Sequence, residues 1–169
     1  MSLMGVHFAV TDSDFRALRS RKGDAERIAF FNAVIEPAYE QNFGTDYDKA
    51  WPLIHSALQR SNPCSDYLER ATRGPASWAI LGEEDIALTD DAMITHVSPS
   101  GATRALQYLQ ALSADDIRSN LIRLIKDHGC AKLSDDDANY AADWYPRLQD
   151  FYSKATSARR HVIFSADFG

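Results

Sequence analysis

A short β-prone run near the start of the chain decides the fold, and it reads Val6-His7-Phe8-Ala9-Val10. Its apolar and aromatic side chains are typical of a strand, and the polar residues that follow favour the start of a helix. A second run of this kind, His161–Phe164, lies near the other end of the chain. Because terminal strands often pair and tie down the chain ends, we expect both runs in one sheet.

The segments between these two runs carry helical patterns. Trp51, Ile54, His55 and Leu58 recur at the spacing of one helix face. Side chains at this spacing lie above one another, so the pattern predicts a helix with one apolar side. We expect this helix to begin near Asp48.

Two later helices have first turns that the sequence defines. Ser113 with Asp116, and Ser134 with Asp137, match the capping-box pattern, in which two side chains bond the free backbone N–H groups of the first turn. Gly129 then suits the position just after a helix, where a left-handed backbone is common.

The middle of the chain, from Cys64 to Asp91, has the least regular pattern. We expect a short helix around Leu68 and an acidic surface loop after Leu81. A strand over Ala92–Val97 follows, because this run is apolar and β-branched and stops at a proline.

These patterns predict a single α+β domain over residues 4–169. Its small sheet includes the N- and C-terminal strands and packs with about five to six helices. Met1, Ser2 and Leu3 precede a second methionine, Met4, and we interpret these three residues as an expression leader.

Composition and charge restrict the kind of function. The 169 residues are 45% hydrophobic and carry a net charge of −6, which disfavours nucleic acid because phosphate binding needs a basic face. No apolar run approaches the roughly 20 residues of a membrane span, and no secretion signal is present, so we expect a cytoplasmic protein without a membrane partner. Cys64 and Cys130 fit two reduced thiols better than a disulfide, although one disulfide stays possible.

No metal and no cofactor are expected from the sequence. The five histidines are scattered without a partner at ligand spacing, and they are His7, His55, His96, His128 and His161. The acidic run Glu83-Glu84-Asp85 lacks the spacing and the glycine of a calcium loop, so a solvated turn is the better interpretation. Neither a phosphate-binding glycine loop nor a nucleophile signature occurs.

Trp51 and His55 are the most suggestive pair of residues. Their spacing stacks an imidazole beside an indole on one helix face. They could form the wall and the polar tip of a pocket, or they could be core residues with a hydrogen-bonded histidine. We favour the core interpretation and retain Trp51, His55, Glu83, Glu84 and Asp85 as binding candidates.

Five segments follow one another along the chain, and they are Met4-Gly5-Val6-His7-Phe8, Asp48-Lys49-Ala50-Trp51 with His55, Ala79-Ile80-Leu81-Gly82, His96-Val97-Ser98-Pro99, and a last strand after a long aromatic helix. Taken in this order, they resemble the YfbM-like family of bacterial proteins, which is grouped as a domain of unknown function. The resemblance covers nearly the whole chain from Met4 and implies an α+β fold without an established activity. This chain departs from the family pattern around Ser98–Gly101, where ligand preference could differ.

Two functions are compatible with these observations. The first is a non-catalytic binding protein that docks an unknown protein or small molecule, for example an immunity- or antitoxin-type protein that neutralises a basic partner. The absence of catalytic motifs and the negative charge favour it. The alternative is a small, hydrolase-like enzyme that uses His55 as acid or base next to Trp51.

Overall fold

One antiparallel sheet lies between two groups of helices. The computed structural model describes residues 4–65 and 74–168. In chain order the elements are β1 (Gly5–Val10), α1 (Asp12–Arg19), α2 (Gly23–Phe30), the π-helical turn η1 (Phe31–Ile35), β2 (Thr45–Asp46), α3 (Trp51–Gln59), α4 (Pro75–Leu81), β3 (Glu84–Leu88), β4 (Ala92–Val97), α5 (Pro99–Gln110), α6 (Ala114–Asp127), α7 (Asp135–Ser157) and β5 (His161–Asp167).

The predicted α+β class and the shared sheet of the two terminal strands are confirmed. The strand order is β2-β1-β5-β4-β3, and β1 pairs with β5 from Gly5 opposite Ala166 to Val10 opposite His161. The described residues form seven α-helices, which exceeds the predicted five to six. The helix that was not predicted is α4. Pro75 and the glycines on either side of this short helix are typical of a loop, so the segment was predicted to be irregular.

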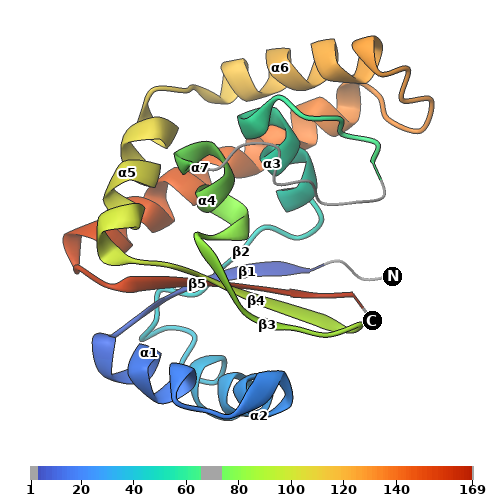
Figure 1. Ribbon diagram of the computed structural model, residues 1–169. Coiled ribbons are helices and arrows are strands. Elements are labelled where there is room, and N and C mark those ends of the chain that lie inside the picture. The colour runs from blue at the N-terminus through green and yellow to red at the C-terminus, as the bar shows by residue number, and fades with distance from the viewer. Residues whose placement is uncertain (1–3, 66–73, 169) are drawn as a thin grey trace.

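The two faces of the sheet carry separate cores. Helices α3 to α7 cover one face, and α1, α2 and η1 lie against the other (Figure 1). Along β1, Ala9 faces the larger core under α3 and α7, whereas Phe8 and Val10 face the smaller core above α1. This alternation is the period-2 pattern of a strand that is buried on both sides. Within the described residues, no helix has both the length and the apolar composition that crossing a bilayer requires.

The acidic segment Glu83–Asp85 leads into an edge strand and not into the predicted surface loop. Ile86 of β3 is buried, and α2 supplies partners to the outer edge of the strand. Arg27 Nη1 donates to the Ile86 carbonyl at 2.7 Å, and the Leu88 N–H donates to Asp24 Oδ2 at 3.2 Å. Charged side chains are common on edge strands because one side faces solvent. The same acidic composition is typical of a surface loop, which is why the strand was not predicted.

Helix α3 begins at Trp51, later than the start predicted near Asp48. Asp48 has a positive φ of 47°, a left-handed conformation that a helix cannot contain. Pro52 falls in the first turn of α3, where a missing N–H costs little. The short helix predicted around Leu68 lies outside the described residues.

The local capping predictions for α6 are confirmed. The Asp116 N–H donates to Ser113 Oγ at 3.1 Å, and the Ser113 N–H donates to Asp116 Oδ2 at 2.7 Å. These bonds to Ser113 lower the pKa of the Asp116 carboxyl. Gly129 follows the helix with a φ of 63°, as a left-handed C-terminal residue does.

Cys64 and Cys130 form a disulfide, so the prediction of two reduced thiols is wrong. Their Cα atoms lie 5.7 Å apart, inside the range that a disulfide spans. Cys64 follows the turn after α3, and Cys130 follows Gly129 at the end of α6. A sequence separation of 66 residues gave no sign that these two helix ends meet.

His7 lies fully buried in the larger core. Its ring is 4.8 Å from that of Phe164 and 5.1 Å from that of Phe151, with Tyr47 at 5.2 Å. Among the residues that the structure describes, neither ring nitrogen has a hydrogen-bond partner of normal geometry. Burial lowers the pKa of His7 from 6.5 to about 3, and the backbone of Ala79 acts in the opposite direction. His7 is therefore neutral in the folded protein at physiological pH.

This buried histidine makes stability depend on pH. The unfolded state binds the proton below pH 6.5, whereas folded His7 resists it down to a pKa of about 3. The contribution is therefore complete above pH 6.5 and falls as the pH falls through this window. Between pH 7 and pH 5, His7 should lower the free energy of unfolding by about 2 kcal/mol.

In the variant His7→Leu, the free energy of unfolding should fall by about 2 kcal/mol less than in the wild type when the pH is lowered from 7 to 5. Urea denaturation at both pH values measures this difference. His128→Leu changes an exposed histidine and should keep the wild-type dependence. Equal losses in His7→Leu and the wild type would show that His7 does not stay neutral in the fold.

Candidate functional site

Trp51 and His55 both lie inside the protein. Trp51 is 0% exposed and packs edge-on against Phe164, with ring centroids 5.1 Å apart. The indole lies so close to Gly5 that a Cβ there would overlap it. His55 is 1% exposed, and the Gln59 amide contacts its ring, with Nε2 3.3 Å from Nδ1.

The cavities formed by described residues near the disulfide, beside α2 and below β1 do not include Trp51 or His55. This environment is that of core residues, and it supports a structural role for the pair.

The three acidic candidates point to different places. Glu83 Oε2 accepts the N–H of Ser98 at 2.6 Å and contacts Gly101, so it lies at the start of α5. Glu84 faces the histidines of the neighbouring strands. Asp85 is exposed on the edge strand. Of these three, Glu84 joins a cluster of titratable side chains among the described residues.

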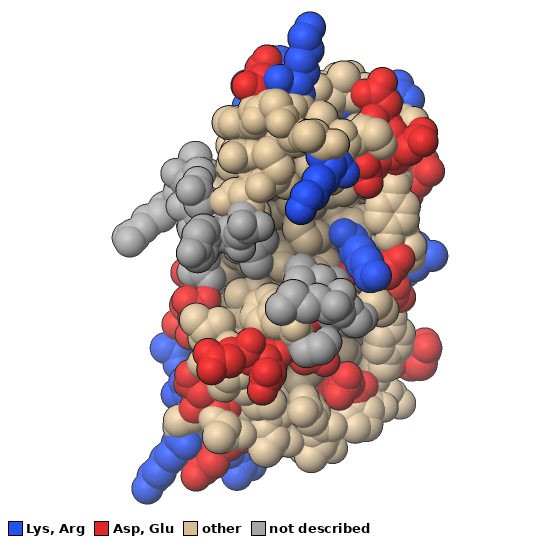
Figure 2. All heavy atoms as spheres, turned by 90° about the vertical axis from the view of Figure 1, so that its right-hand side faces the viewer, with Lys and Arg blue, Asp and Glu red and all other residues tan. Residues whose placement is uncertain are grey.

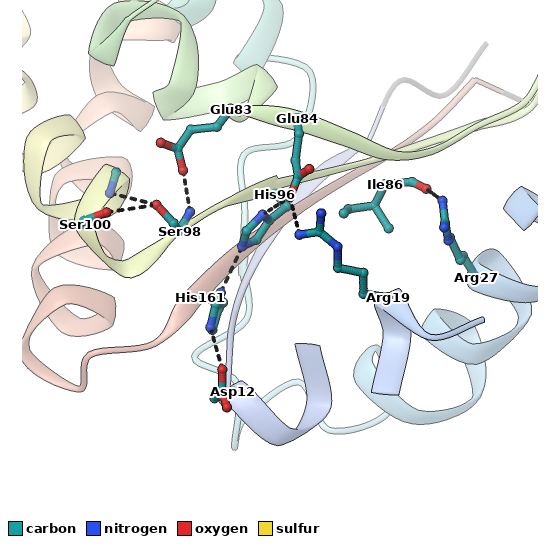
Figure 3. Close-up of polar contacts among 11 residues, drawn as sticks. Asp12, Arg19, Arg27, Glu83, Glu84, Ile86, His96, Ser98, Ser100 and His161 are labelled. Carbon is teal, nitrogen blue, oxygen red and sulfur yellow. Dashed lines mark hydrogen bonds and ion pairs between the residues drawn. The ribbon is translucent and has the colours of Figure 1, made fainter. Parts of the chain in front are cut away.

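This cluster is a continuous chain of four side chains from four elements (Figure 3). Glu84 Oε1 lies 2.9 Å from His96 Nδ1, His96 Nε2 lies 2.9 Å from His161 Nδ1, and His161 Nε2 lies 3.2 Å from Asp12 Oδ1. Phe15 stacks on both imidazoles at 3.9 and 4.3 Å. We call these four polar residues the histidine chain.

Strand register creates the histidine chain. Glu84 and His96 are direct cross-strand partners, and His96 is opposite Ile163 of β5, two residues from His161. Side chains at such direct and diagonal positions lie within reach of one another. Asp12 comes from the first turn of α1, just after β1. The histidines are visible in the sequence but the strand register is not, so their meeting could not be predicted.

The histidine chain needs one more proton than two neutral imidazoles supply. It has three hydrogen bonds, and ionised carboxylates only accept, so three N–H groups are required. Burial lowers the pKa of His96, with the charge of His161 in the same direction and Glu84 opposing. A neutral His96 gives its single N–H to Glu84 and accepts from His161. The other His161 nitrogen, Nε2, lies next to Asp12, the second carboxylate of the chain.

Such a chain can hold or move a proton, but its rings are covered. His96 is 4% exposed, and Phe15 lies across both imidazoles. The exposed groups are at the two ends, where Asp12 also pairs with Arg16 at 2.8 Å and Glu84 pairs with Arg19 at 3.0 Å. This arrangement fastens α1 to the sheet. Within the described residues, no three His, Cys, Asp or Glu side chains are grouped so as to hold a metal ion.

A different feature lies at the end of the sheet where the start of β1 pairs with the end of β5. A cavity of about 200 Å3 has apolar walls from Met4, Val6 and Phe31. The carboxylates of Glu36 and Asp167 line the same cavity. Both residues are exposed, and neither has an ion-pair partner in the described part of the chain.

The hairpin that joins β3 to β4 adds charge at this end. Asp90 and Asp91 are exposed and have no ion-pair partner among residues 4–65 and 74–168, and Leu88 beside them is 56% exposed. The Phe168 N–H donates to the Asp91 carbonyl at 2.8 Å and so joins the hairpin to the end of β5. We call this surface, formed by the cavity and the hairpin tip, the acidic sheet end.

The fold and these features define a class, a small α+β protein with one antiparallel sheet covered by helices on both faces. The chain belongs to the family described as Domain of unknown function (DUF1877), whose profile matches residues 1–165. It is similar to the crystal structure of YfbM, a protein of unknown function from Escherichia coli, with a TM-score of 0.64 and 16% identity over 96% of this chain and 99% of that one. The expected resemblance to the YfbM-like family is thereby confirmed. Among curated proteins, no match was found.

The tautomer of His96 tests the histidine chain. At neutral pH, nitrogen NMR of the imidazoles should show His96 protonated on Nδ1 and bare on Nε2, because Glu84 accepts from Nδ1. Glu84→Ala removes that acceptor and should release the tautomer, whereas Asp85→Ala on the same strand should not. Protonation of both His96 nitrogens at neutral pH would contradict the proposed order of donors.

Proposed function

We propose that this protein is a non-catalytic binding protein that docks a basic partner protein on the acidic sheet end. An immunity- or antitoxin-type protein that neutralises a basic partner is one form of this function. The observation that carries the proposal is the apolar cavity lined also by Glu36 and Asp167, whose carboxylates have no ion-pair partner in the described segments 4–65 and 74–168. An apolar side chain next to a lysine or arginine of the partner would fit this combination.

Charge supports the same kind of partner. Figure 2 looks onto this end of the molecule, and its lower half shows acidic side chains with basic ones toward the left margin. The chain carries a net charge of −6. A concentration of unpaired carboxylates raises the rate of encounter with a basic protein and disfavours acidic competitors.

The acidic sheet end is also held in place before any partner binds. At the hairpin tip the Thr89 N–H donates to the Ala92 carbonyl at 2.9 Å, and the Ala92 N–H donates to Thr89 Oγ1 at 3.1 Å. At the other side, the Asp167 N–H donates to the Met4 carbonyl at 3.3 Å. A surface that is ordered beforehand loses less conformational entropy on binding.

The histidine chain is what favours the second candidate, a small enzyme. It is a better proton carrier than His55, because its two imidazoles are hydrogen-bonded in series. Phe15 covers both rings, however, so a substrate would have to reach the chain through its carboxylate ends. We therefore rank an enzyme below a binding protein.

The test is affinity capture from a lysate of the source organism with matched variants. Ser165 lies in the cavity and is only partly buried, so Ser165→Phe should fill the cavity without unfolding the protein. Combined with Asp167→Asn and Glu36→Gln, it should lower recovery of a basic partner by about tenfold or more. Wild-type recovery should fall as salt is raised, because exposed charges are screened.

The control carries equivalent changes elsewhere on the surface. Ser119→Phe, Asp127→Asn and Asp143→Asn alter exposed residues of α6 and α7 and should leave recovery at the wild-type level. Equal recovery by both triple variants, or a captured partner that is acidic, would overturn the proposal.

A further inference from the structure

The two cysteines of the Cys64–Cys130 disulfide differ in their exposure to solvent. Cys64 is exposed, whereas Cys130 is 5% exposed. The bond lies in a surface cleft of about 540 Å3, and Pro63, Leu133 and Lys132 are among its other lining residues. This volume falls within the range of sites that take small molecules.

The cleft contains groups that suit a small anionic thiol. Lys132 is exposed at its edge and supplies a positive charge for a carboxylate. The Asn62 Oδ1 atom lies 3.1 Å from Cys64 Sγ and 3.8 Å from Cys130 Sγ. A disulfide sulfur has no proton to donate, whereas a thiol S–H does. Asn62 is therefore placed to accept from either sulfur after the bond has been reduced.

We propose that the Cys64–Cys130 disulfide is a thiol–disulfide exchange site, at which a small anionic thiol of the glutathione type becomes bonded to Cys64. The incoming thiolate attacks Cys64 Sγ and forms a new S–S bond. The Cys64–Cys130 bond breaks, its electron pair goes to Cys130 Sγ, and the resulting thiolate takes a proton from water. The product carries a mixed disulfide at Cys64 and a thiol at Cys130.

A second thiol completes the exchange. Its thiolate attacks the small-molecule sulfur of the mixed disulfide, and Cys64 leaves as a thiolate that is protonated by water. Two small thiols are thereby oxidised to a disulfide, and the protein disulfide is reduced by two electrons. Attack begins at Cys64 because exchange requires access to the sulfur, and Cys130 is buried.

The exchange does not require unfolding. The Cys130 N–H donates to the Ile125 carbonyl at 3.0 Å, and the Leu133 N–H donates to the Cys130 carbonyl at 3.1 Å. On the other side of the cleft, the Cys64 N–H donates to Asn62 Oδ1 at 3.0 Å. These bonds hold both cysteines by their backbones, so the cleft keeps its shape when the disulfide opens.

The experiment treats the folded full chain with glutathione in the absence of denaturant. The reaction is quenched with acid, free thiols are alkylated, and the peptides are identified by mass spectrometry. One glutathione adduct should appear on Cys64 together with alkylated Cys130, before complete reduction. A disulfide that reacts only in denaturant, or an adduct on Cys130, would overturn the proposal.

A charge reversal tests the role of Lys132. Lys132→Glu should slow the reaction with glutathione about three- to tenfold and leave the reaction with neutral 2-mercaptoethanol unchanged. The control Lys126→Glu makes the same change on α6 outside the cleft lining and should react with both thiols at the wild-type rate. An equal effect of both variants on glutathione would refute a specific anion contact at Lys132.

Discussion

The antiparallel pairing of β1 with β5 is the constraint on which the rest of the structure depends. It joins the first described strand to the last, residue by residue from Gly5 opposite Ala166 to Val10 opposite His161. Pairing at such a separation closes a loop of almost the whole chain, and that entropic cost must be offset by burial. The offset comes from both faces, because Phe164 packs into the core under α7 and Ile163 packs into the core above α1. The other three strands then extend the sheet on either side of this pair.

The central strands also fix the positions of the helices. Trp51 at the start of α3 lies directly against Gly5 of β1, where any larger residue would collide with the indole. Arg160, just before β5, donates to the Ala9 carbonyl at 3.0 Å, and the Asp167 N–H at its end donates to the Met4 carbonyl at 3.3 Å. These contacts join α3 and the residues that flank β5 to the same two strands. Because β1 and β5 are antiparallel, the start of β1 and the end of β5 lie at the same end of the sheet (Figure 1).

Features that depend on neighbouring residues could be predicted from the sequence, and features that depend on long-range register could not. The cap formed by Ser113 and Asp116 depends on two residues that are three positions apart. The two terminal strands are predicted by their apolar and aromatic composition. The meeting of His96 with His161 needs the pairing of β4 with β5, and the disulfide needs two helix ends to converge. The charge of Glu84 makes it a binding candidate, but its partner His96 follows only from the pairing of β3 with β4. The sequence therefore shows the residue types of the histidine chain but not their arrangement in space.

The alternation of side chains along each strand determines which face of the sheet each histidine lies on, and therefore its environment. His7 points into the larger core, where aromatic rings surround it and burial keeps it neutral. His96 and His161 point to the opposite face, where Glu84 and Asp12 satisfy their nitrogens. A slip of one residue between β4 and β5 would turn one of the two imidazoles into the apolar core, because neighbouring side chains point to opposite faces. That exchange would leave a polar ring without partners and would also expose an apolar residue to the carboxylates. The polar chain on one face thus reinforces the register that the apolar residues on the other face require.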